Sequence, residues 1–296
     1  GTAGPSHSAV VGNKYYTCCG GGNINVVNTD TGAIVAAIPV DSGGYFARVG
    51  TKLYVTDGTN DEVNVVDTVT DTIVATIPVG DGPFYSITAG TKVYIDNLNA
   101  GTVSVIDSAT DTVVATVMTT AATYLTVAGT NVYVSNNTSN TVSVIDTHTD
   151  TIIATVPTGD TPYALNTIGD KVYVLNGHDN NVTVIDSTTN TATNTIAVGG
   201  NPLYVVAVGE KAYVANGVDS SISVIDTIDE EVIATIPLGF SPYAEVVFGD
   251  KVYVGGTSGE TDIAVIDTVT DEVAETISVG LSPRRPSAVP AHAYAN

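Results

Sequence analysis

Short stretches in which hydrophobic and polar residues alternate follow one another along nearly the whole chain. Residues 152–156 (IIATV), 171–175 (KVYVL) and 182–186 (VTVID) are examples, rich in β-branched residues. Alternation with this composition is typical of β-strands, and no stretch shows the period of an amphipathic helix. A fourth kind of stretch follows a Gly-x-x-Pro turn, as in residues 159–168. The pattern predicts an all-β protein.

A tetrad of the form Gly-x-Lys-hydrophobic repeats at intervals of 38 to 40 residues, with Asn131 in place of the lysine in one repeat. Each interval holds four predicted strands, and four strands in about 40 residues are typical of one blade of a β-propeller. The tetrads begin at Gly12, Gly50, Gly90, Gly129, Gly169, Gly209 and Gly249. The sequence therefore predicts a seven-bladed β-propeller, with four antiparallel strands per blade, over residues 1–283.

Both ends of the chain match the first strand of a repeat, and only one of them can complete the first blade. Residues 5–12 match it, and so do residues from 283 onward, which continue into a decayed second strand. Pro286 and Pro290 each remove a backbone donor from a sheet, which favours the N-terminal segment. We expect residues 284–296 to form a C-terminal tail or a decayed repeat.

Three repeats share the string Tyr-Val-x-Asn, at residues 133–136, 173–176 and 213–216, followed by a strand that ends in Val-Ile-Asp. The chain has no tryptophan, which excludes a WD40 repeat. The strings, in register over residues 5 to 283, resemble the YVTN family of β-propeller repeats. This resemblance implies a surface-layer, secreted or other cell-envelope protein, located outside the cell or on its surface. The Ser-Pro-Asp-Gly turn common in that family is absent.

The charge of the chain is strongly negative because bases are scarce. Among 296 residues, 9 are Lys or Arg and 31 are Asp or Glu, which gives a net charge of −22. Such a field repels phosphate backbones and anionic membranes, so nucleic acid is excluded as a partner. No apolar run approaches the roughly 20 residues of a transmembrane helix. A protein or cell-envelope component, or a small or cationic ligand, is the expected partner.

The lysines all stand in the tetrads, at the predicted start of the second strand. Antiparallel pairing places each one opposite the aspartate that ends the third strand. Exposed pairs contribute about 0–1 kcal/mol each, so we expect them to fix register more than to add stability. A ring of bases that binds an anion is the functional alternative. The expected pairs are Lys52 with Asp67, Lys92 with Asp107, Lys171 with Asp186, Lys211 with Asp226 and Lys251 with Asp267.

The turns at residues 67–72, 107–112 and 146–151 present the carboxylate and hydroxyl oxygens that calcium prefers. They lack the glycine and glutamate of an EF-hand loop, and Asp side chains that bond their own turn are the simpler expectation. The loops between second and third strands, at residues 57–62, 96–101, 136–140, 176–180 and 216–221, predict a polar, acidic mouth. A divalent cation such as calcium is a candidate cofactor there, although no motif identifies a metal.

Aromatic residues stand on the predicted innermost strand of six repeats, where they form either an aromatic collar that stacks a flat ligand or packing between blades. The candidates are Tyr45, Phe84, Tyr85, Tyr124, Tyr163, Tyr204 and Tyr243, with His7 at the matching place in the first repeat. Arg48 and Glu245 interrupt these strands with charge. Together with His7, Arg284 and Arg285 they form a second candidate site at the channel mouth, the alternative being solvated charge.

Adjacent Cys18 and Cys19 replace the Thr-Asn pair of the family string. They form either a vicinal disulfide, two free thiols or part of a soft-metal site, and no Cys-x-x-Cys spacing supports the last.

Two functions fit the sequence. The first is a noncatalytic extracellular or cell-surface propeller that acts as a binding or structural module, and the absence of a catalytic motif favours it. The second is an enzyme with a site at the central channel mouth, since seven-bladed relatives include lactonases and dehydrogenase subunits; a shared fold alone does not decide the chemistry.

Overall fold

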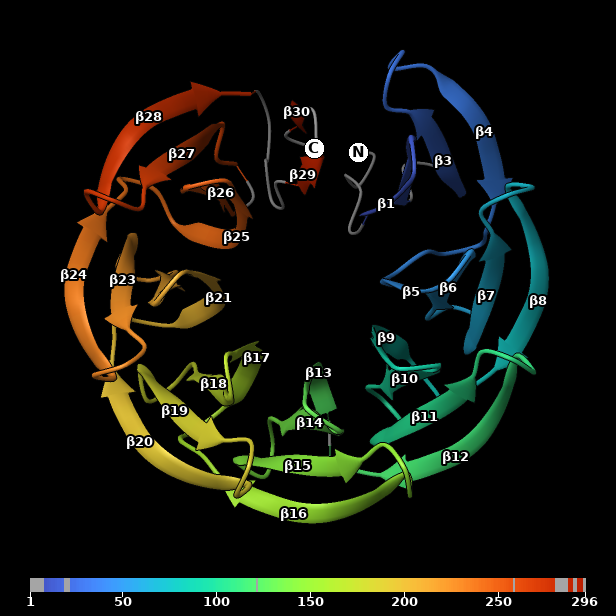
Figure 1. The fold of residues 1–296 in the computed structure, drawn as a ribbon, viewed down its shortest axis with the longest axis horizontal. Helices are drawn as coiled ribbons and strands as arrows, with labels where there is room; N and C mark the ends of the chain where they lie inside the picture. The colour runs from blue at the N-terminus through green and yellow to red at the C-terminus, as the bar shows by residue number, and fades with distance from the viewer. Residues whose placement is uncertain are drawn as a thin grey trace. The chain divides into compact units, whose positions relative to one another are not determined.

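The chain folds as an all-β, seven-bladed propeller in which each blade is a four-stranded antiparallel sheet (Figure 1). The computed structural model describes residues 8–18, 22–120, 122–257, 259–279, 287–289 and 292–294. Each sheet takes its strands in chain order, as predicted from the repeat. The chain divides into two compact units, Gly1–Thr138 with Ser143–Ala154, and Ser139–Val142 with Thr155–Asn296.

The strands recur with nearly constant bounds from blade to blade. Blades 1 to 4 are formed by β1 (Ser8–Val11), β2 (Lys14–Cys18), β3 (Asn23–Asn28) and β4 (Ile34–Pro39); β5 (Phe46–Val49), β6 (Lys52–Asp57), β7 (Glu62–Asp67) and β8 (Thr72–Pro78); β9 (Pro83–Ala89), β10 (Lys92–Asn97), β11 (Thr102–Asp107) and β12 (Thr112–Met118); and β13 (Ala122–Ala128), β14 (Asn131–Asn136), β15 (Thr141–Asp146) and β16 (Thr151–Pro157). Blades 5 to 7 are formed by β17 (Pro162–Ile168), β18 (Lys171–Asn176), β19 (Asn181–Asp186) and β20 (Thr191–Ala197); β21 (Pro202–Val208), β22 (Lys211–Asn216), β23 (Ser221–Asp226) and β24 (Glu231–Pro237); and β25 (Pro242–Phe248), β26 (Lys251–Gly256), β27 (Asp262–Asp267) and β28 (Glu272–Ser278).

The two ends of the chain behave differently. The N-terminal strand β1 pairs with β2 and completes blade 1, as predicted. Residues after blade 7 include a short hairpin of β29 (Ser287–Val289) and β30 (His292–Tyr294), and β29 lies against β25. No helix in the described part of the chain has the length and apolar character needed to cross a membrane.

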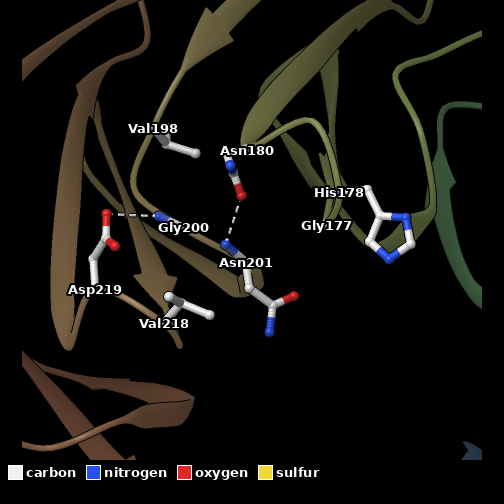
Figure 2. Close-up of a pocket in the computed structure, with 8 residues that line it drawn as sticks. All are labelled: Gly177, His178, Asn180, Val198, Gly200, Asn201, Val218 and Asp219. Carbon is white, nitrogen blue, oxygen red and sulfur yellow. Dashed lines mark hydrogen bonds between the residues drawn. The ribbon is translucent and has the colours of Figure 1, made fainter.

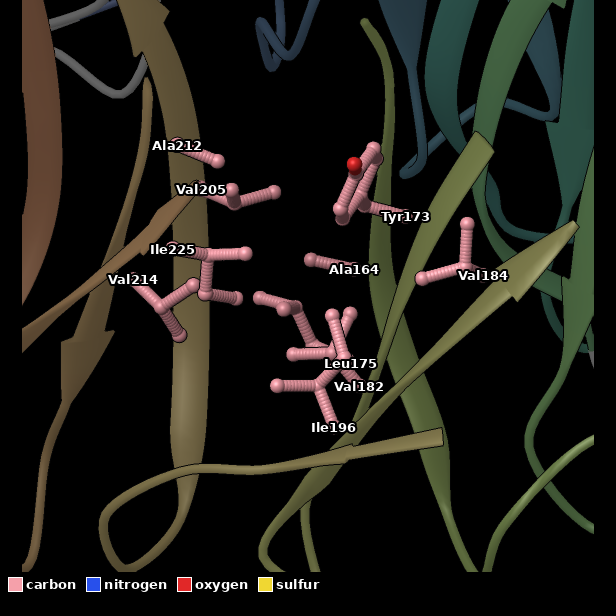
Figure 3. Close-up of a cluster of buried hydrophobic side chains, with 10 residues drawn as sticks. All are labelled: Ala164, Tyr173, Leu175, Val182, Val184, Ile196, Val205, Ala212, Val214 and Ile225. Atoms are coloured by element: carbon pink, nitrogen blue, oxygen red, sulfur yellow. The ribbon is translucent and has the colours of Figure 1, made fainter. Parts of the chain in front are cut away.

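The hydrophobic core lies between the blades. Second and third strands are buried on both faces because each sheet packs against its neighbours, whereas fourth strands are mostly exposed, as in β20, where Ile196 is the one buried residue. Figure 3 shows the layer between blades 5 and 6, in which Leu175 of blade 5 points toward Ile225 of blade 6 within one buried cluster. Burying such aliphatic side chains stabilises by about 1.5–3 kcal/mol each, so most stability resides in these layers.

The lysines stand in the predicted register, but their ion pairs differ from the prediction. Lys52 lies opposite Asp67 in the ladder, and the same register holds in the other predicted pairs. Lys52 Nζ nevertheless bonds Asp111 of the next blade at 2.7 Å. Asp67 is occupied by its own turn, where its Oδ1 accepts from the backbone N–H groups of Val69 and Thr70. The Asp67 carboxylate thus bonds its own turn, while Lys52 bonds the neighbouring blade.

We call the resulting arrangement the Lys-Tyr-Asp clamp. In blade 2, Lys52 and Tyr54 bind the two oxygens of the Asp111 carboxylate at 2.7 and 2.6 Å, and Lys52 also donates to the Ser108 carbonyl. Asp111 has a φ of 53°, the left-handed conformation that Asp adopts more readily than most residues. The same clamp joins Lys14 and Tyr16 to Asp71, Lys92 and Tyr94 to Asp150, and Lys211 and Tyr213 to Asp271. Of the three Tyr-Val-x-Asn strings, the one that begins at Tyr213 supplies its tyrosine to a clamp.

The asparagine of that string braces two strands of its own blade. Asn216 Nδ2 donates to the hydroxyls of Ser221 and Ser223, and Asn97 makes equivalent bonds. Asn176 Nδ2 donates to one hydroxyl and to the Asn181 side-chain oxygen. A Cβ on Gly199 would lie 2.6 Å from Asn216 Cγ. The first glycine of the Gly-x-x-Pro turn, here Gly199, therefore leaves room for the Asn216 side chain.

The aspartates that end the third strands bind their own turns. Asp186 Oδ1 accepts from the backbone N–H groups of Thr188 and Thr189, and Asp107, Asp146, Asp226 and Asp267 make the same bonds. These turns therefore have Asx-turn geometry, as expected if the Asp side chains bond their own turn. The Thr188 hydroxyl, followed by the Thr189 and Thr188 amides, lowers the pKa of Asp186 to about 2.

We expect Asp186→Ala to lower the thermal midpoint more at pH 7 than at pH 2. A carboxyl whose pKa is lowered in the folded state stabilises it above the unfolded pKa of 3.8, and this contribution is lost as the pH falls through about 2. Thermal melts at both pH values test this, with Thr191→Ala as a control in the same turn. Equal losses at the two pH values would contradict it.

Candidate functional site

Aromatic residues on the first strands, or directly before them, gather into one cluster in the first unit. Tyr45 lies 4.9 Å from Phe84 and 4.6 Å from Tyr85, measured between ring centroids. Tyr124 lies 5.0 Å from Tyr85 and 6.4 Å from Phe84, and its hydroxyl lies 3.4 Å from that of Tyr45. Tyr45 and Tyr124 are buried, whereas Phe84 is 38% exposed. We call these four residues the aromatic cluster; they come from blades 2, 3 and 4.

The first-strand tyrosines of the second unit pack separately. Tyr163 contacts the core layer between blades 5 and 6, and Tyr204 contacts the layer between blades 6 and 7. Tyr243 is half-buried on β25. Tyr163 and Tyr204 therefore pack between blades.

Asp96 carries an unpaired carboxyl group in the first unit. Its side chain is fully buried in β10, and neither carboxylate oxygen has a hydrogen-bond partner among the described residues. Burial raises the pKa of Asp96 to about 8. The sequence prediction placed Asp96 at the start of a polar, acidic loop, which is wrong, because Asp96 lies within β10 and is buried. The signal was its position directly before the asparagine of the repeated string, where Thr56 and Ser135 stand in blades 2 and 4.

Glu245 is a second buried acid, on the first strand of blade 7. It is 5% exposed and lies opposite Val254, in a position held by Leu165 and Val205 in the two preceding blades. Burial raises the pKa of Glu245 well above its ordinary value, and the backbone of Val206 offsets only part of this rise. No donor reaches either carboxylate oxygen with hydrogen-bond geometry in the described part of the chain.

The other predicted site residues have ordinary surroundings or lie outside the described residues. Arg48 is exposed, and its Nε donates to the Gly50 carbonyl of its own strand end at 2.9 Å. Cys18 is buried and disulfide-bonded. The predicted residues outside the described part are His7, Cys19, Arg284 and Arg285.

A pocket of about 610 Å³ opens in the second unit, among loops of blades 5 and 6. Figure 2 shows its lining, which combines the side chains of His178, Asn201 and Asp219 with Val198 and Val218. His178 Nδ1 lies 3.0 Å from Thr161 Oγ1 and 3.3 Å from Asp160 Oδ2, so one ring nitrogen is held while the ring stays 74% exposed. The sequence did not predict this pocket, because its residues come from three separate turns.

The polar loops around this pocket hold neighbouring turns in place. Asn180 Oδ1 accepts from the backbone N–H of Asn201, and Asp219 Oδ2 accepts from that of Gly200, as Figure 2 shows. Asp219, one of the acidic residues in the loops predicted to form a polar, acidic mouth, thus accepts a hydrogen bond from the backbone. In the part of the chain that the structure describes, no three His, Cys, Asp or Glu residues are placed to hold a metal ion.

Comparison with known proteins identifies the fold and no family. No family model and no curated protein matches the chain. Among solved structures, the computationally designed Ika8 protein is similar with a TM-score of 0.84, 13% identity and coverage of 98% of this chain and 92% of Ika8. Dihydro-heme d1 dehydrogenase NirN, in complex with DHE, has a TM-score of 0.80 and 14% identity, with 94% of this chain covered and 66% of NirN. Apo AztD from Citrobacter koseri has a TM-score of 0.70 and 14% identity, with 94% and 88% covered. Identities this low support the propeller fold alone, a fold that enzymes and binding proteins share.

Proposed function

We propose that the chain is a noncatalytic binding module of the YVTN type that acts outside the cell or on its surface. The observation that carries this proposal is the use of the repeated polar residues. Lysine, tyrosine and aspartate of the repeats bind one another across blades, and the turn aspartates bind their own backbone. Groups used in this way are not available as acid, base or nucleophile, which leaves the variable loops as the place where a ligand binds.

The pocket of blades 5 and 6 is the proposed binding surface. It offers two apolar side chains, amide and carboxylate oxygens, and an imidazole, a mixture typical of sites that take small polar ligands. Its ionisable side chains are His178 and Asp219, and lysine and arginine are absent from its lining. A neutral or cationic small molecule, or the matching group of a protein or cell-envelope partner, fits this lining better than an anion does.

A thermal-shift screen with calcium chloride, diaminopentane and glucose tests the proposal. We expect at least one of these probes to raise the melting temperature of the wild-type chain, and the shift to disappear in Val218→Arg, which places a bulky cation in the pocket. His148→Ala is the matched control, since His148 is 73% exposed in a turn of the first unit. No shift with any probe, or a shift that persists in Val218→Arg, would contradict the proposal.

The Asp160 and His178 pair supports one alternative, an enzyme whose site lies in this pocket. A carboxylate and a hydroxyl at Nδ1 orient an imidazole so that Nε2 can act as a general base. Hydrolysis of a simple lactone by the wild-type chain, lost in His178→Ala and retained in His148→Ala, would favour this alternative over the noncatalytic module.

A further inference from the structure

The core layer between blades 3 and 4 contains aromatic rings and one acidic side chain near the first strands. Tyr94 belongs to the buried core of this layer, and Tyr85 packs against the same core. The Tyr85 ring lies 5.0 Å from that of Tyr124 on β13. Asp96 follows Tyr94 by two residues on β10, so both side chains leave the strand on the same face. The carboxyl therefore enters the layer that holds the aromatic rings.

The equivalent residues of neighbouring blades show what Asp96 replaces. Thr56 Oγ1 accepts from the Tyr45 backbone N–H and donates to the Phe84 carbonyl of the next blade. Ser135 Oγ likewise bonds the backbone of Tyr124. A hydroxyl at this position therefore bonds the backbone of its own blade at Tyr45 or Tyr124, and Thr56 also bonds the first strand of the next blade. Asp96 is fully buried and makes no such hydrogen bond. Blade 3 therefore has an unpaired acid where its neighbours have a hydrogen-bonded hydroxyl.

We propose that Asp96 and the aromatic cluster form a binding site for a small organic ammonium ion. The faces of aromatic rings attract cations within about 6 Å, and a carboxylate in a desolvated place supplies the opposite charge. Phe84, the cluster residue open to solvent, marks the side from which the ligand enters. This site lies in the first unit and is independent of the pocket of blades 5 and 6.

The basic side chains near Asp96 bond other groups, so no side chain among them serves as its counter-cation. Lys92, on the same strand, bonds Asp150, and Arg48 of β5 bonds the Gly50 carbonyl. The titratable groups on the strands packed against β10 are Tyr85 on β9, Tyr124 on β13, Arg48 on β5 and Asp107 on β11, with Lys92 and Tyr94 on β10 itself. None of the basic groups among them pairs with Asp96.

Binding should release a proton. With a pKa of about 8, the Asp96 carboxyl is mostly protonated at pH 7 in the free protein, and a bound cation favours the ionised form. The proton passes to the buffer as the ion pair forms. Affinity for the cation should therefore rise with pH from 6 to 9 and level off above the pKa of the free carboxyl.

Isothermal titration with choline tests the proposal. We expect choline to bind the wild-type chain at pH 7 with an apparent enthalpy that differs between phosphate and Tris buffers, as release of up to one proton requires. Asp96→Asn should weaken binding at least tenfold and abolish the buffer dependence, and Phe84→Ala should weaken binding without abolishing proton release. Glu245→Gln, which alters a buried acid of the other unit, is the matched control and should bind choline as the wild type does.

A second variant separates loss of binding from loss of folding. Asp96→Thr restores the residue of blade 2 and should fold at least as stably as the wild type, while losing choline binding. The proposal is overturned if choline fails to bind the wild-type chain, or if it binds Asp96→Thr with unchanged affinity. Either result leaves the proposed pocket of blades 5 and 6 untouched, since its probes and variants are different.

Discussion

Asp111→Ala is expected to destabilise the folded chain by about 2–3 kcal/mol, among the largest losses for any single polar residue. The change removes the acceptor of two strong bonds, to Lys52 Nζ and to the Tyr54 hydroxyl. Breaking a fully buried ion pair costs about 3–5 kcal/mol, because the remaining charge stays unpaired. The side chains of Lys52 and Asp111 are 29% and 17% exposed, so water recovers part of that cost. Urea unfolding followed by circular dichroism measures the loss.

Blade 5 provides a natural control for this clamp. Glu230 replaces the aspartate there and pairs with Lys171, but the Tyr173 hydroxyl has no hydrogen-bond partner among the described residues. Burial and the nearby Glu230 carboxylate raise the pKa of Tyr173 to about 12. Glu230→Asp should bring back the tyrosine bond and stabilise the chain by about 0.5–1.5 kcal/mol. A loss of stability in Glu230→Asp, or an unchanged midpoint in Asp111→Ala, would show that the clamp contributes little.

The clamp also shows which parts of the structure could be predicted from the sequence. The 40-residue period, the strand order and the register of Lys52 opposite Asp67 are all confirmed, because they follow from local alternation and short turns. The true partner of Lys52 was not predictable in this way. Asp111 lies 59 residues away in the chain, and its place beside Lys52 depends on how one blade packs on the next.

The candidate sites were harder to predict than the fold for a related reason. Tyr45, Tyr85 and Tyr124 were singled out by their repeat position, yet whether such rings meet or pack apart depends on the neighbouring blade. Asp96 looked like one more acid of a polar loop, since composition does not reveal on which side of a strand end a residue is buried. The pocket around His178 joins turns that no single motif connects.

The second large effect is expected at Glu245, where an acid stands in a hydrophobic layer. Glu245→Leu should stabilise the chain at pH 7 by about 1–3 kcal/mol, the usual cost of burying a polar group without a partner. Leucine already stands at the equivalent position in Leu125 and Leu165, so the layer accepts its shape. Thermal and urea unfolding of the variant and the wild type measure the gain.

The gain should depend on pH in a definite direction. The pKa of Glu245 is raised in the folded state above the unfolded value of 4.5, so the folded chain holds a proton that the unfolded chain releases. Stability is therefore complete below pH 4.5 and declines as the pH rises toward the folded pKa. The advantage of Glu245→Leu should be smallest at pH 4 and grow toward pH 8. Glu245→Gln, which cannot ionise but stays polar, should remove the pH dependence while recovering only part of the stability. An advantage of Glu245→Leu that is equal at pH 4 and pH 8 would mean that this carboxyl does not change its protonation on folding.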